Sequence, residues 1–446
     1  MAEQTSSQSG KKRVVIAGGG LSGLCLAQAM LRDGWDVDVY ERDAGSQVRG
    51  QGYRLTLRPH GFEALRECLP DGVFQFIVQT TKQAEAGAGF VFSDAQLEEL
   101  LRRNFPVDGS ALGGQADRNT LRQGLLIGLK GRVHFGKAVA SYEESTSGAA
   151  GRPVQVVFQD GTRTSADVLV GADGVHSRVR KQRLPDADPE ELEMSAVYGM
   201  TLFDKQPATS LLQRTINNAG LLALGDDTTF FTTAMRFKER PAAIAHRLGL
   251  EVGLCGREDY LMWAVSVPGR RDPIQEDPVA LHQLALQRVA AFHPDVVDIV
   301  AKADRADTLG VPLRRTPPQR PWQPSRVTLI GDAVHTMPPF TANGANTALV
   351  DAATLSRHLR RHLEDPGASI ESCIGAYEAE MRVYSQDAIR EGMMMLKTVF
   401  APSKPVRLFV RLCFWLLRTS SHPTRRFYLL AFLISIIAVL SFKFLF

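Results

Sequence analysis

Cysteine is scarce in this 446-residue chain, which contains only five, at widely separated positions. None of them forms a C-x-x-C pair or a spacing that is typical of a metal-binding motif. Small secreted domains usually contain an even, closely spaced set of cysteines that forms disulfides. The scattered thiols therefore indicate a reduced, cytosolic environment and no metal centre.

The amino terminus lacks the apolar segment of a secretory signal peptide, because its first ten residues are largely polar. The sequence also contains no Asn-x-Ser/Thr acceptor site for N-glycosylation. Both absences agree with a protein that is not exported.

Acidic residues are missing from residues 401–446, which contain seven basic ones. Residues 1–400 contain 45 basic and 48 acidic residues, so most of the chain is mildly acidic. A nucleic-acid-binding domain would present an excess of basic residues. The charge distribution therefore argues against nucleic-acid binding. It puts the excess positive charge beside a hydrophobic end, which is typical of a membrane-surface segment.

A strand–turn–helix–strand pattern opens the chain. The apolar run Val14–Ala17 is typical of a buried strand, and it leads into Gly18-x-Gly20-x-x-Gly23. A helical stretch and a second strand follow. Glycines with this spacing allow a tight turn, close approach of the backbone to a diphosphate, and close packing of helix on strand. The helix that follows offers free N–H groups at its positive end.

This fingerprint predicts a dinucleotide site, but NAD and FAD fit it equally well, and a glycine-rich turn without a ligand is a third interpretation. Glu41 lies 18 residues after Gly23, at the end of the second strand. A carboxylate there can accept hydrogen bonds from ribose hydroxyls. It would also repel a 2′-phosphate, so NADP is not expected at this particular site.

Three later segments resemble motifs of the group A flavin monooxygenases, the flavoprotein aromatic hydroxylases. Residues 173–180 read DGVHSRVR and resemble the family's DGxxSxxR motif. Residues 331–333 read GDA and resemble its second FAD motif. Residues 335–351 are similar in spacing to its HxxxPxxGxGxNxxxxD stretch. With Arg118, the resemblance covers most of residues 11–360.

The resemblance implies FAD as the cofactor and gives several residues a role. Arg118 is expected on the phosphate side of FAD, and Asp173 in the diphosphate region where NAD(P)H approaches. Asp332 is expected to bond the ribityl hydroxyls. Backbone N–H groups near Gly344 and Ala345 are expected at the pyrimidine edge of the flavin, where a helix N-terminus stabilises negative charge.

Two further positions qualify this resemblance. The segment Gly50-x-Gly52 resembles the family's loop that passes the flavin, although a simple turn explains these glycines equally well. Where the family usually has Gly-Gln-Gly, this chain has Ala342-Asn343-Gly344, so a methyl group stands where the backbone can approach the cofactor. The predicted cofactor-binding residues are Gly18, Gly20, Gly23, Glu41, Gly52, Arg118, Asp173, Asp332, Gly344 and Ala345.

The predicted architecture is an α/β fold: a Rossmann-like FAD-binding domain, interrupted by a β-rich substrate domain, with a C-terminal transmembrane helix. Short β-like runs at 228–237 and 261–267 predict an antiparallel sheet in the substrate domain. The predicted boundaries are 11–75, 115–187 and 312–360 for the FAD-binding domain, 76–114 and 188–311 for the substrate domain, and 361–403 for a helical region.

The resemblance implies a monooxygenase reaction. NAD(P)H reduces FAD, and O₂ adds to the reduced flavin as a C4a-(hydro)peroxide. That species hydroxylates or epoxidises an electron-rich substrate, or attacks a carbonyl. The cofactor carries the chemistry, while the protein excludes water and orients the substrate. No second nicotinamide fingerprint is evident in the sequence, as expected where NAD(P)H docks transiently.

No catalytic acid or base can be assigned from the sequence. Tyr198, Arg236, His246 and Tyr260 fall in the predicted substrate domain and could polarise a phenol or a carbonyl. Ordinary core or surface roles explain each of them more simply. His335 is interpreted as a packing residue beside the second FAD motif.

The carboxyl terminus is strongly apolar. Residues 427–446 contain 17 apolar residues out of 20, and as a helix they would span about 30 Å, one bilayer core. Residues 404–426 predict a basic interfacial helix. The positive-inside rule then predicts a single-pass membrane anchor with a cytosolic catalytic body, and the endoplasmic reticulum is the expected membrane. A buried core helix and a hairpin within one leaflet are the alternatives.

The sequence thus predicts a membrane-anchored, FAD-dependent monooxygenase acting on a lipophilic small molecule, such as a polyketide or terpenoid specialised metabolite. A flavin reductase or oxidase is the nearest enzymatic alternative. A flavin-binding membrane scaffold without turnover is an alternative from another class. A flavin halogenase is disfavoured because its WxWxI signature is missing: Trp263 is followed two residues later by Val265.

Overall fold

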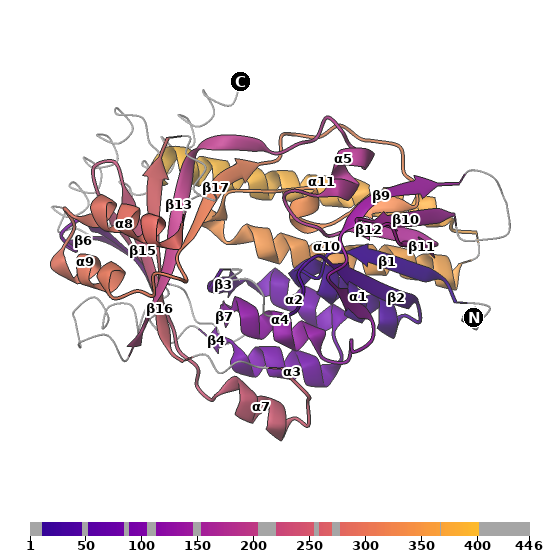
Figure 1. Ribbon diagram of the computed structural model, residues 1–446, viewed down its shortest axis with the longest axis horizontal. Coiled ribbons are helices and arrows are strands. Elements are labelled where there is room, and N and C mark those ends of the chain that lie inside the picture. Colours follow the sequence, from indigo (N-terminus) through magenta and orange to yellow (C-terminus); the bar gives the residue numbers. More distant parts are fainter. Residues whose placement is uncertain are drawn as a thin grey trace, which may run out of the picture.

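The computed structural model describes residues 11–46, 52–83, 89–104, 113–145, 153–203, 220–253, 258–269, 277–365 and 367–400. These residues form a parallel sheet surrounded by helices, a seven-stranded sheet beside it, and two three-stranded sheets (Figure 1). The two larger sheets come from segments that alternate along the chain.

The parallel sheet has five strands in the order β18-β12-β1-β2-β8. They are β1 (Arg13–Ala17), β2 (Asp36–Glu41), β8 (Val133–Phe135), β12 (Val168–Gly171) and β18 (Val327–Leu329). Every residue of β12 and β18 is buried, as expected of strands covered on both faces. The α/β prediction is therefore confirmed.

Helices cover this sheet. They are α1 (Leu21–Arg32), α2 (Pro59–Cys68), α3 (Asp71–Thr80), α4 (Arg118–Leu126), α5 (Arg178–Arg183), α10 (Asn343–Glu364) and α11 (Ile370–Met395).

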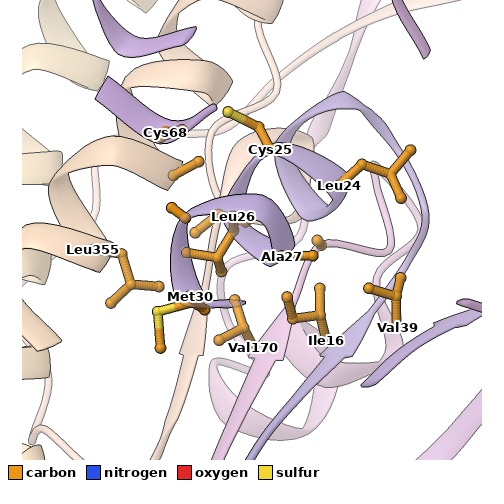
Figure 2. Close-up of a cluster of buried hydrophobic side chains, with 14 of the residues drawn as sticks. Ile16, Leu24, Cys25, Leu26, Ala27, Met30, Val39, Cys68, Val170 and Leu355 are labelled. Carbon is orange, nitrogen blue, oxygen red and sulfur yellow. The ribbon is translucent and has the colours of Figure 1, made fainter. Parts of the chain in front are cut away.

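Helix α1 is buried along most of its length because it lies between the sheet, α2 and α10 (Figure 2). Leu24, Leu26 and Met30 are fully buried. Met30 lies toward Leu355 of α10, whereas Leu24 lies on the other side of the helix (Figure 2). Complete burial of one such side chain stabilises the fold by about 1.5–3 kcal/mol. This core fixes the start of α1, where the glycine turn lies.

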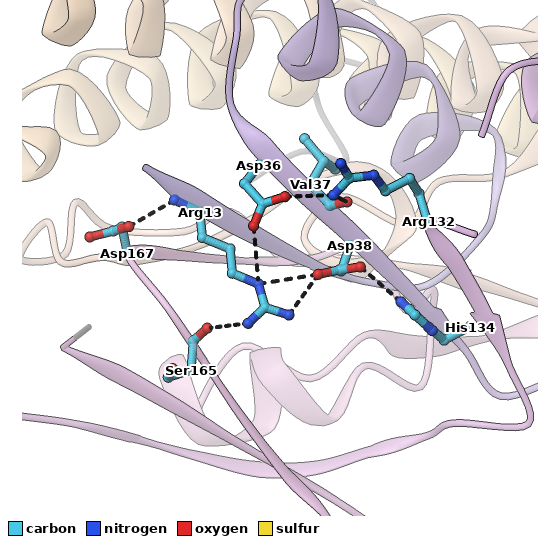
Figure 3. Close-up of polar contacts among 8 residues, drawn as sticks. All are labelled: Arg13, Asp36, Val37, Asp38, Arg132, His134, Ser165 and Asp167. Atoms are coloured by element: carbon cyan, nitrogen blue, oxygen red, sulfur yellow. Dashed lines mark hydrogen bonds and ion pairs between the residues drawn. The ribbon is translucent and has the colours of Figure 1, made fainter. Parts of the chain in front are cut away.

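A polar network joins the strands at the amino-terminal edge of the parallel sheet (Figure 3). Arg13 Nη2 donates to Asp38 Oδ2 at 2.6 Å, and His134 Nε2 lies 2.8 Å from Asp38 Oδ1. The backbone N–H of Arg13 donates to Asp167 Oδ2. Burial alone would raise the pKa of Asp38, but the hydrogen bonds from His134 and Arg13 hold it below its ordinary value. The network lies at the opposite edge from the glycine turn and has a structural role.

The seven-stranded sheet has the order β17-β13-β16-β15-β14-β5-β6. Its strands are β5 (Gly89–Asp94), β6 (Glu99–Asn104), β13 (Glu190–Leu202), β14 (Gly220–Leu224), β15 (Thr229–Met235), β16 (Tyr260–Pro268) and β17 (Leu309–Arg315). The predicted antiparallel pairing holds except between β14 and β5, which are parallel. Helices α8 (Pro278–Val289) and α9 (Pro294–Ala301) pack on one face.

Close packing in this sheet requires a glycine at position 199. A Cβ atom there would lie 2.1 Å from the Trp263 ring, which belongs to the neighbouring strand β16. Val197 and Trp263 contribute to the core under α8 and α9. Tyr198 and Met200, which alternate with Val197 and Gly199 on β13, belong to a different cluster on the other face.

Two smaller sheets complete the described fold. Strands β9 (Val139–Glu144), β10 (Val154–Phe158) and β11 (Arg163–Ala166) form an antiparallel sheet. The second, which the sequence analysis did not anticipate, consists of β3 (Arg54–Leu57), β7 (Gly114–Asp117) and β4 (Lys82–Gln83). It lies between the helices around the parallel sheet and the seven-stranded sheet (Figure 1).

The predicted domain boundaries remain predictions, and four of them fall inside elements. The boundaries at 75/76 and 114/115 lie within α3 and β7, and those at 311/312 and 360/361 lie within β17 and α10. Helix α7 (Pro241–Arg247), from the predicted substrate domain, packs against α3.

The described chain ends with α11 and a π-helical turn at Leu396–Phe400. Among the helices of the described ranges, none has the length and apolarity needed to cross a membrane. The predicted interfacial helix (404–426) and transmembrane segment (427–446) lie outside the described residues.

Candidate cofactor and substrate site

Four predicted site residues follow four neighbouring strands of the parallel sheet. Asp332 comes shortly after β18, Asp173 after β12, Gly18 after β1, and Glu41 ends β2. Because the strands are parallel, all four residues lie at the carboxyl edge, in this order. With neighbouring strands about 4.8 Å apart, the edge between β18 and β2 is about 14 Å long. Ligands of open α/β sheets bind at this kind of edge.

The three glycines of the turn have different roles. A Cβ on Gly18, whose φ is +112°, would lie 2.3 Å from the Ala172 carbonyl oxygen, and a Cβ on Gly23 would lie 2.2 Å from the Gly18 carbonyl oxygen. These two glycines therefore permit the packing of β1, β12 and α1. A Cβ on Gly20 would meet nothing within 4 Å, so the absence of a side chain leaves open space there. Gly20 also begins α1 without a side-chain cap.

Glu41 is buried and holds the glycine turn. Its Oε2 accepts a hydrogen bond from the Gly19 N–H at 2.7 Å, and its Oε1 accepts one from the Asp43 N–H at 2.9 Å. Each carboxylate oxygen can accept a second hydrogen bond. The position therefore fits the predicted contact with ribose hydroxyls, and the backbone contacts add a structural role.

Asp173 connects the end of β12 to α5. Its Oδ2 accepts a hydrogen bond from the Arg178 N–H at 2.8 Å, at the start of that helix. Its Oδ1 is buried and has no hydrogen-bond partner among the described residues. Burial raises the pKa of Asp173, although hydrogen bonds from Ser177 and Arg178 oppose this shift. A buried, unpartnered carboxylate oxygen is suited to accept a hydrogen bond from a ligand.

Asp332 and Arg118 lie near each other on the two sides of the site. Although the Asp332 side chain is exposed, protein atoms around it exclude part of the surrounding water and raise its pKa, while His335 and Arg118 lower it. Burial lowers the pKa of Arg118, which is half-buried, and Asp332 raises it. Gly52 has a φ of +82°, and a Cβ there would lie 3.8 Å from Arg118 Cδ, so the two predicted residues are adjacent.

The first turn of α10 carries Gly344 and Ala345, both half-buried. Ala342 precedes the helix in the left-handed conformation, with φ +55° and ψ +24°, and gives the helix no side-chain cap. The departure from the family glycine therefore falls at a position whose backbone favours glycine. Buried Asn346 accepts a hydrogen bond from the Arg58 N–H at 2.9 Å and donates to the Thr56 carbonyl at 2.8 Å.

A buried ion pair lies behind Asp332. His335 Nε2 is 2.6 Å from Asp351 Oδ2, which also accepts a hydrogen bond from the Gly331 N–H; Tyr384 donates to Asp351 Oδ1. Burial lowers the pKa of His335, but the carboxylate of Asp351 outweighs it and raises the pKa above its ordinary value. The interpretation of His335 as a packing residue did not include its contact with Asp351, which only the tertiary fold reveals.

The end of α11 and the residues after it contact the start of α10 and the turn before it. Asn343 Nδ2 donates to Glu391 Oε2 at 2.7 Å. Phe400, the last described residue, stacks on Phe340 with ring centroids 3.8 Å apart. Phe400 therefore lies close to the flavin side of the predicted site.

The face of the seven-stranded sheet opposite α8 and α9 is rich in aromatic residues and methionine. We call it the aromatic–methionine face; it comprises Tyr198, Met200, Phe231, Met235, Tyr260 and Met262, with Leu202 and Leu309, and Tyr53 and Phe237 from outside the seven strands pack in the same cluster. The Tyr260 hydroxyl donates to Asp117 Oδ2 at 2.8 Å, and Asp117 Oδ1 caps α4. Since α4 begins with Arg118, this hydrogen bond connects the face to the cofactor side.

The structure separates the four residues that the sequence analysis singled out in the substrate domain. Tyr198 and Tyr260 belong to the aromatic–methionine face. Burial raises the pKa of Tyr198 to about 12. Arg236 is exposed and lies 3.7 Å from Asp259, and His246 is exposed on α7. Within the described ranges, no group of His, Cys, Asp or Glu side chains is arranged to hold a metal ion.

The donors and spaces at the carboxyl edge fit FAD. Open space beside Gly20 and an uncapped helix suit a diphosphate, Glu41 suits a ribose, and Asp332 suits the hydroxyls of a ribityl chain. The edge leads to a second uncapped helix, α10, and then to an apolar face. This combination defines a flavin-dinucleotide-binding protein.

Comparison with known families gives the same assignment. A family model described as an FAD binding domain matches residues 11–392. The match covers most of the chain, which therefore belongs to this FAD-binding family.

Known relatives are FAD-dependent monooxygenases. A dual O-methyltransferase/FAD-dependent monooxygenase of Cercospora beticola is 30% identical over 87% of this chain and 46% of the relative. A chloroplastic zeaxanthin epoxidase of Oryza sativa is 25% identical over 88% of this chain and 56% of the relative. The chain thus spans about half the length of these relatives. A structure from Photorhabdus luminescens, named as an FAD-containing monooxygenase, is 26% identical with a TM-score of 0.72, over 87% of this chain and 99% of that one.

Proposed function

We propose that the chain is an FAD-dependent monooxygenase that uses NAD(P)H and O₂ to oxygenate a lipophilic small molecule. The observation that carries this proposal is the hydrogen bond between Tyr260 and Asp117, which joins the aromatic–methionine face to the helix of Arg118. Bound FAD would supply electron transfer from NAD(P)H and activation of O₂. One relative is named as an epoxidase, which supports oxygen insertion as the reaction class.

The chain's own residues would bind and orient the cofactor. Glu41 and the open side of Gly20 would take the ribose and the diphosphate. Arg118 and Asp332 would lie beside the phosphates and the ribityl chain. The N-terminus of α10 at Gly344 would favour negative charge on the flavin.

The aromatic–methionine face would exclude water and hold an apolar substrate. Its methionines are flexible and polarisable, so they adapt to an irregular hydrophobic molecule. Because the pKa of Tyr198 is about 12, its hydroxyl stays protonated at neutral pH. Tyr198 would then donate a hydrogen bond to a phenol or carbonyl oxygen and orient the substrate.

We also propose that residues 404–446 anchor the enzyme to a membrane with its catalytic part in the cytosol, the endoplasmic reticulum being the expected site. The six basic residues that precede the apolar run at 427–446, and the run itself, support this proposal. The position of Phe400 against Phe340 suits delivery of a substrate from the bilayer. A polyketide or terpenoid specialised metabolite is the proposed substrate class.

The test measures NAD(P)H oxidation and ¹⁸O₂ incorporation by the full chain in detergent, across a panel of polyketides and terpenoids. We expect a substrate that stimulates NAD(P)H oxidation and acquires ¹⁸O. With that substrate, Tyr198→Phe should raise KM or lower kcat, while Tyr142→Phe, in the distant β9 strand, should leave both unchanged. Stimulated oxidation with hydrogen peroxide and no ¹⁸O-labelled product would favour a reductase or oxidase instead. Bound FAD with no turnover would favour a scaffold.

The membrane proposal has its own assay. Full-length protein mixed with anionic vesicles should float with them in a density gradient, and a chain ending at residue 403 should not. Flotation of both proteins, or of neither, would contradict the proposed anchor.

A further inference from the structure

Arg122 lies in the middle of α4, is 4% exposed, and reaches back to the glycine turn. Its Nε donates to the Gly19 carbonyl oxygen at 2.9 Å. Its Nη1 donates to the Ser46 carbonyl oxygen at 2.5 Å. One guanidinium group therefore joins α4, the turn after β1 and the loop after β2. Arg122 is 103 residues from Gly19 along the chain, so no local sequence pattern indicates this contact.

These contacts fix the orientation of one peptide unit. The N–H of Gly19 donates to Glu41 and its carbonyl accepts from Arg122, so Gly19 is held on both sides. In a trans peptide, the C=O of one residue and the N–H of the next point in opposite directions. Because Arg122 holds the Gly19 carbonyl, the Gly20 N–H points away from Arg122. A Cβ on Gly20 would meet nothing within 4 Å, so this residue borders open space.

One nitrogen of the Arg122 guanidinium, Nη2, is buried and has no hydrogen-bond partner among the described residues. A buried unsatisfied donor is costly, more so when it is charged, and such groups usually meet a ligand or a water molecule. Burial lowers the pKa of Arg122, whereas the nearby Glu41 and Asp43 raise it. The neighbours of the guanidinium are thus the residues at the ribose end of the edge.

We propose that Arg122 is a second FAD-binding arginine, distinct from Arg118, that acts on the AMP half of the cofactor. It positions the Gly19–Gly20 peptide for the diphosphate, and its Nη2, which lies at the ribose end of the edge, donates to a ribose oxygen of that half. This inference rests on FAD binding and is independent of whether the enzyme transfers oxygen.

The test uses full-length apoprotein in detergent and measures dissociation constants for FAD, by quenching of flavin fluorescence, and for ADP, by calorimetry. ADP is the probe for the AMP half. A hydrogen bond to a charged group contributes about 1.5–3 kcal/mol, which corresponds to a loss of affinity of about tenfold to a hundredfold. We expect Arg122→Gln to weaken FAD and ADP binding by similar factors in this range. Arg122→Lys should lose less affinity than Arg122→Gln, because lysine keeps the positive charge but lacks the several planar N–H donors of the guanidinium.

Two controls separate positioning from folding. Lys130→Ala, an exposed residue after α4, should change neither dissociation constant. Asp332→Asn, on the flavin side, should weaken FAD but not ADP. The melting temperature of the apoprotein is measured for each variant. Ethylguanidinium, which can replace the missing guanidinium group, is added to Arg122→Ala before ADP binding is measured. If Arg122 has only a structural role, its variants should melt at a lower temperature than the parent protein. At a temperature where they are still folded, they should bind ADP as tightly as the parent protein does.

Three results would overturn the proposal. The first is that a folded Arg122→Gln or Arg122→Lys variant binds FAD as tightly as the parent protein. The second is weaker FAD binding with unchanged ADP affinity. The third is failure of ethylguanidinium to restore any ADP binding to Arg122→Ala. A parent protein that binds ADP but oxygenates no substrate would contradict only the proposed enzyme activity.

Discussion

Replacing single glycines of the turn should separate cofactor binding from folding. In Gly20→Ala the new methyl group meets no protein atom within 4 Å, and the φ of −77° at this position is allowed for alanine. Loss of a helix-capping glycine costs up to about 1 kcal/mol, while alanine reduces the freedom of the unfolded chain by about 0.4–1 kcal/mol. The free energy of unfolding of the apoprotein should therefore change little.

Gly23→Ala should behave in the opposite way. Its methyl group would lie 2.2 Å from the Gly18 carbonyl oxygen, which is backbone and cannot move aside cheaply. Overpacking of this kind costs about 1–3 kcal/mol or more. The apoprotein itself should be destabilised, and FAD binding should suffer because α1 is displaced.

Urea denaturation of each apoprotein and an FAD titration at low denaturant test this pair. Gly20→Ala should retain the urea midpoint of the parent protein but bind FAD at least about tenfold more weakly, since its methyl group occupies the space proposed for the diphosphate. The reasoning fails if Gly20→Ala binds FAD as tightly as the parent protein, or if its apoprotein is as unstable as Gly23→Ala.

Three further predictions concern stability. Ala342→Gly should raise the free energy of unfolding by up to about 1 kcal/mol, because an L-residue at φ +55° is strained by about 1–2 kcal/mol and glycine returns part of this as unfolded-state entropy; a lower urea midpoint would contradict it. Asp38→Asn should destabilise the protein at pH 7 by about 1–3 kcal/mol. Because the pKa of Asp38 is held below 3.8 in the folded state, its stabilisation is present above that pH and is lost as the pH falls further. The difference between variant and parent should accordingly shrink below pH 3.8, and a pH-independent difference would argue against this. Tyr260→Phe should cost about 1–3 kcal/mol, because it removes a buried donor to Asp117; an unchanged urea midpoint would show that the bond contributes nothing.

Local patterns in the sequence predicted the part of the site that depends on local geometry. The glycine spacing placed Gly18, Gly20 and Gly23 at the turn between β1 and α1, because strand, turn and helix are contiguous. The resemblance to flavin monooxygenases identified Asp173 and Asp332, each of which follows a buried strand. The sheet order brings them to one edge.

Contacts between distant segments could not be predicted in this way. The β3-β7-β4 sheet pairs short segments with no strong alternation, and β14 lies parallel to β5, more than 100 residues earlier. The contact of Arg122 with Gly19 and the pairing of His335 with Asp351 also depend on the tertiary fold. The sequence showed an alanine at position 342 in place of the family's glycine. It did not show that the backbone of Ala342 is strained.

The central claim is that FAD lies along the carboxyl edge of the parallel sheet. A density map of the full chain in complex with FAD tests it most directly. We predict the adenosine ribose beside Glu41, the diphosphate beside Gly20, and the ribityl chain beside Asp332. FAD at another place on the protein, or an edge without FAD at saturating cofactor, would contradict the account.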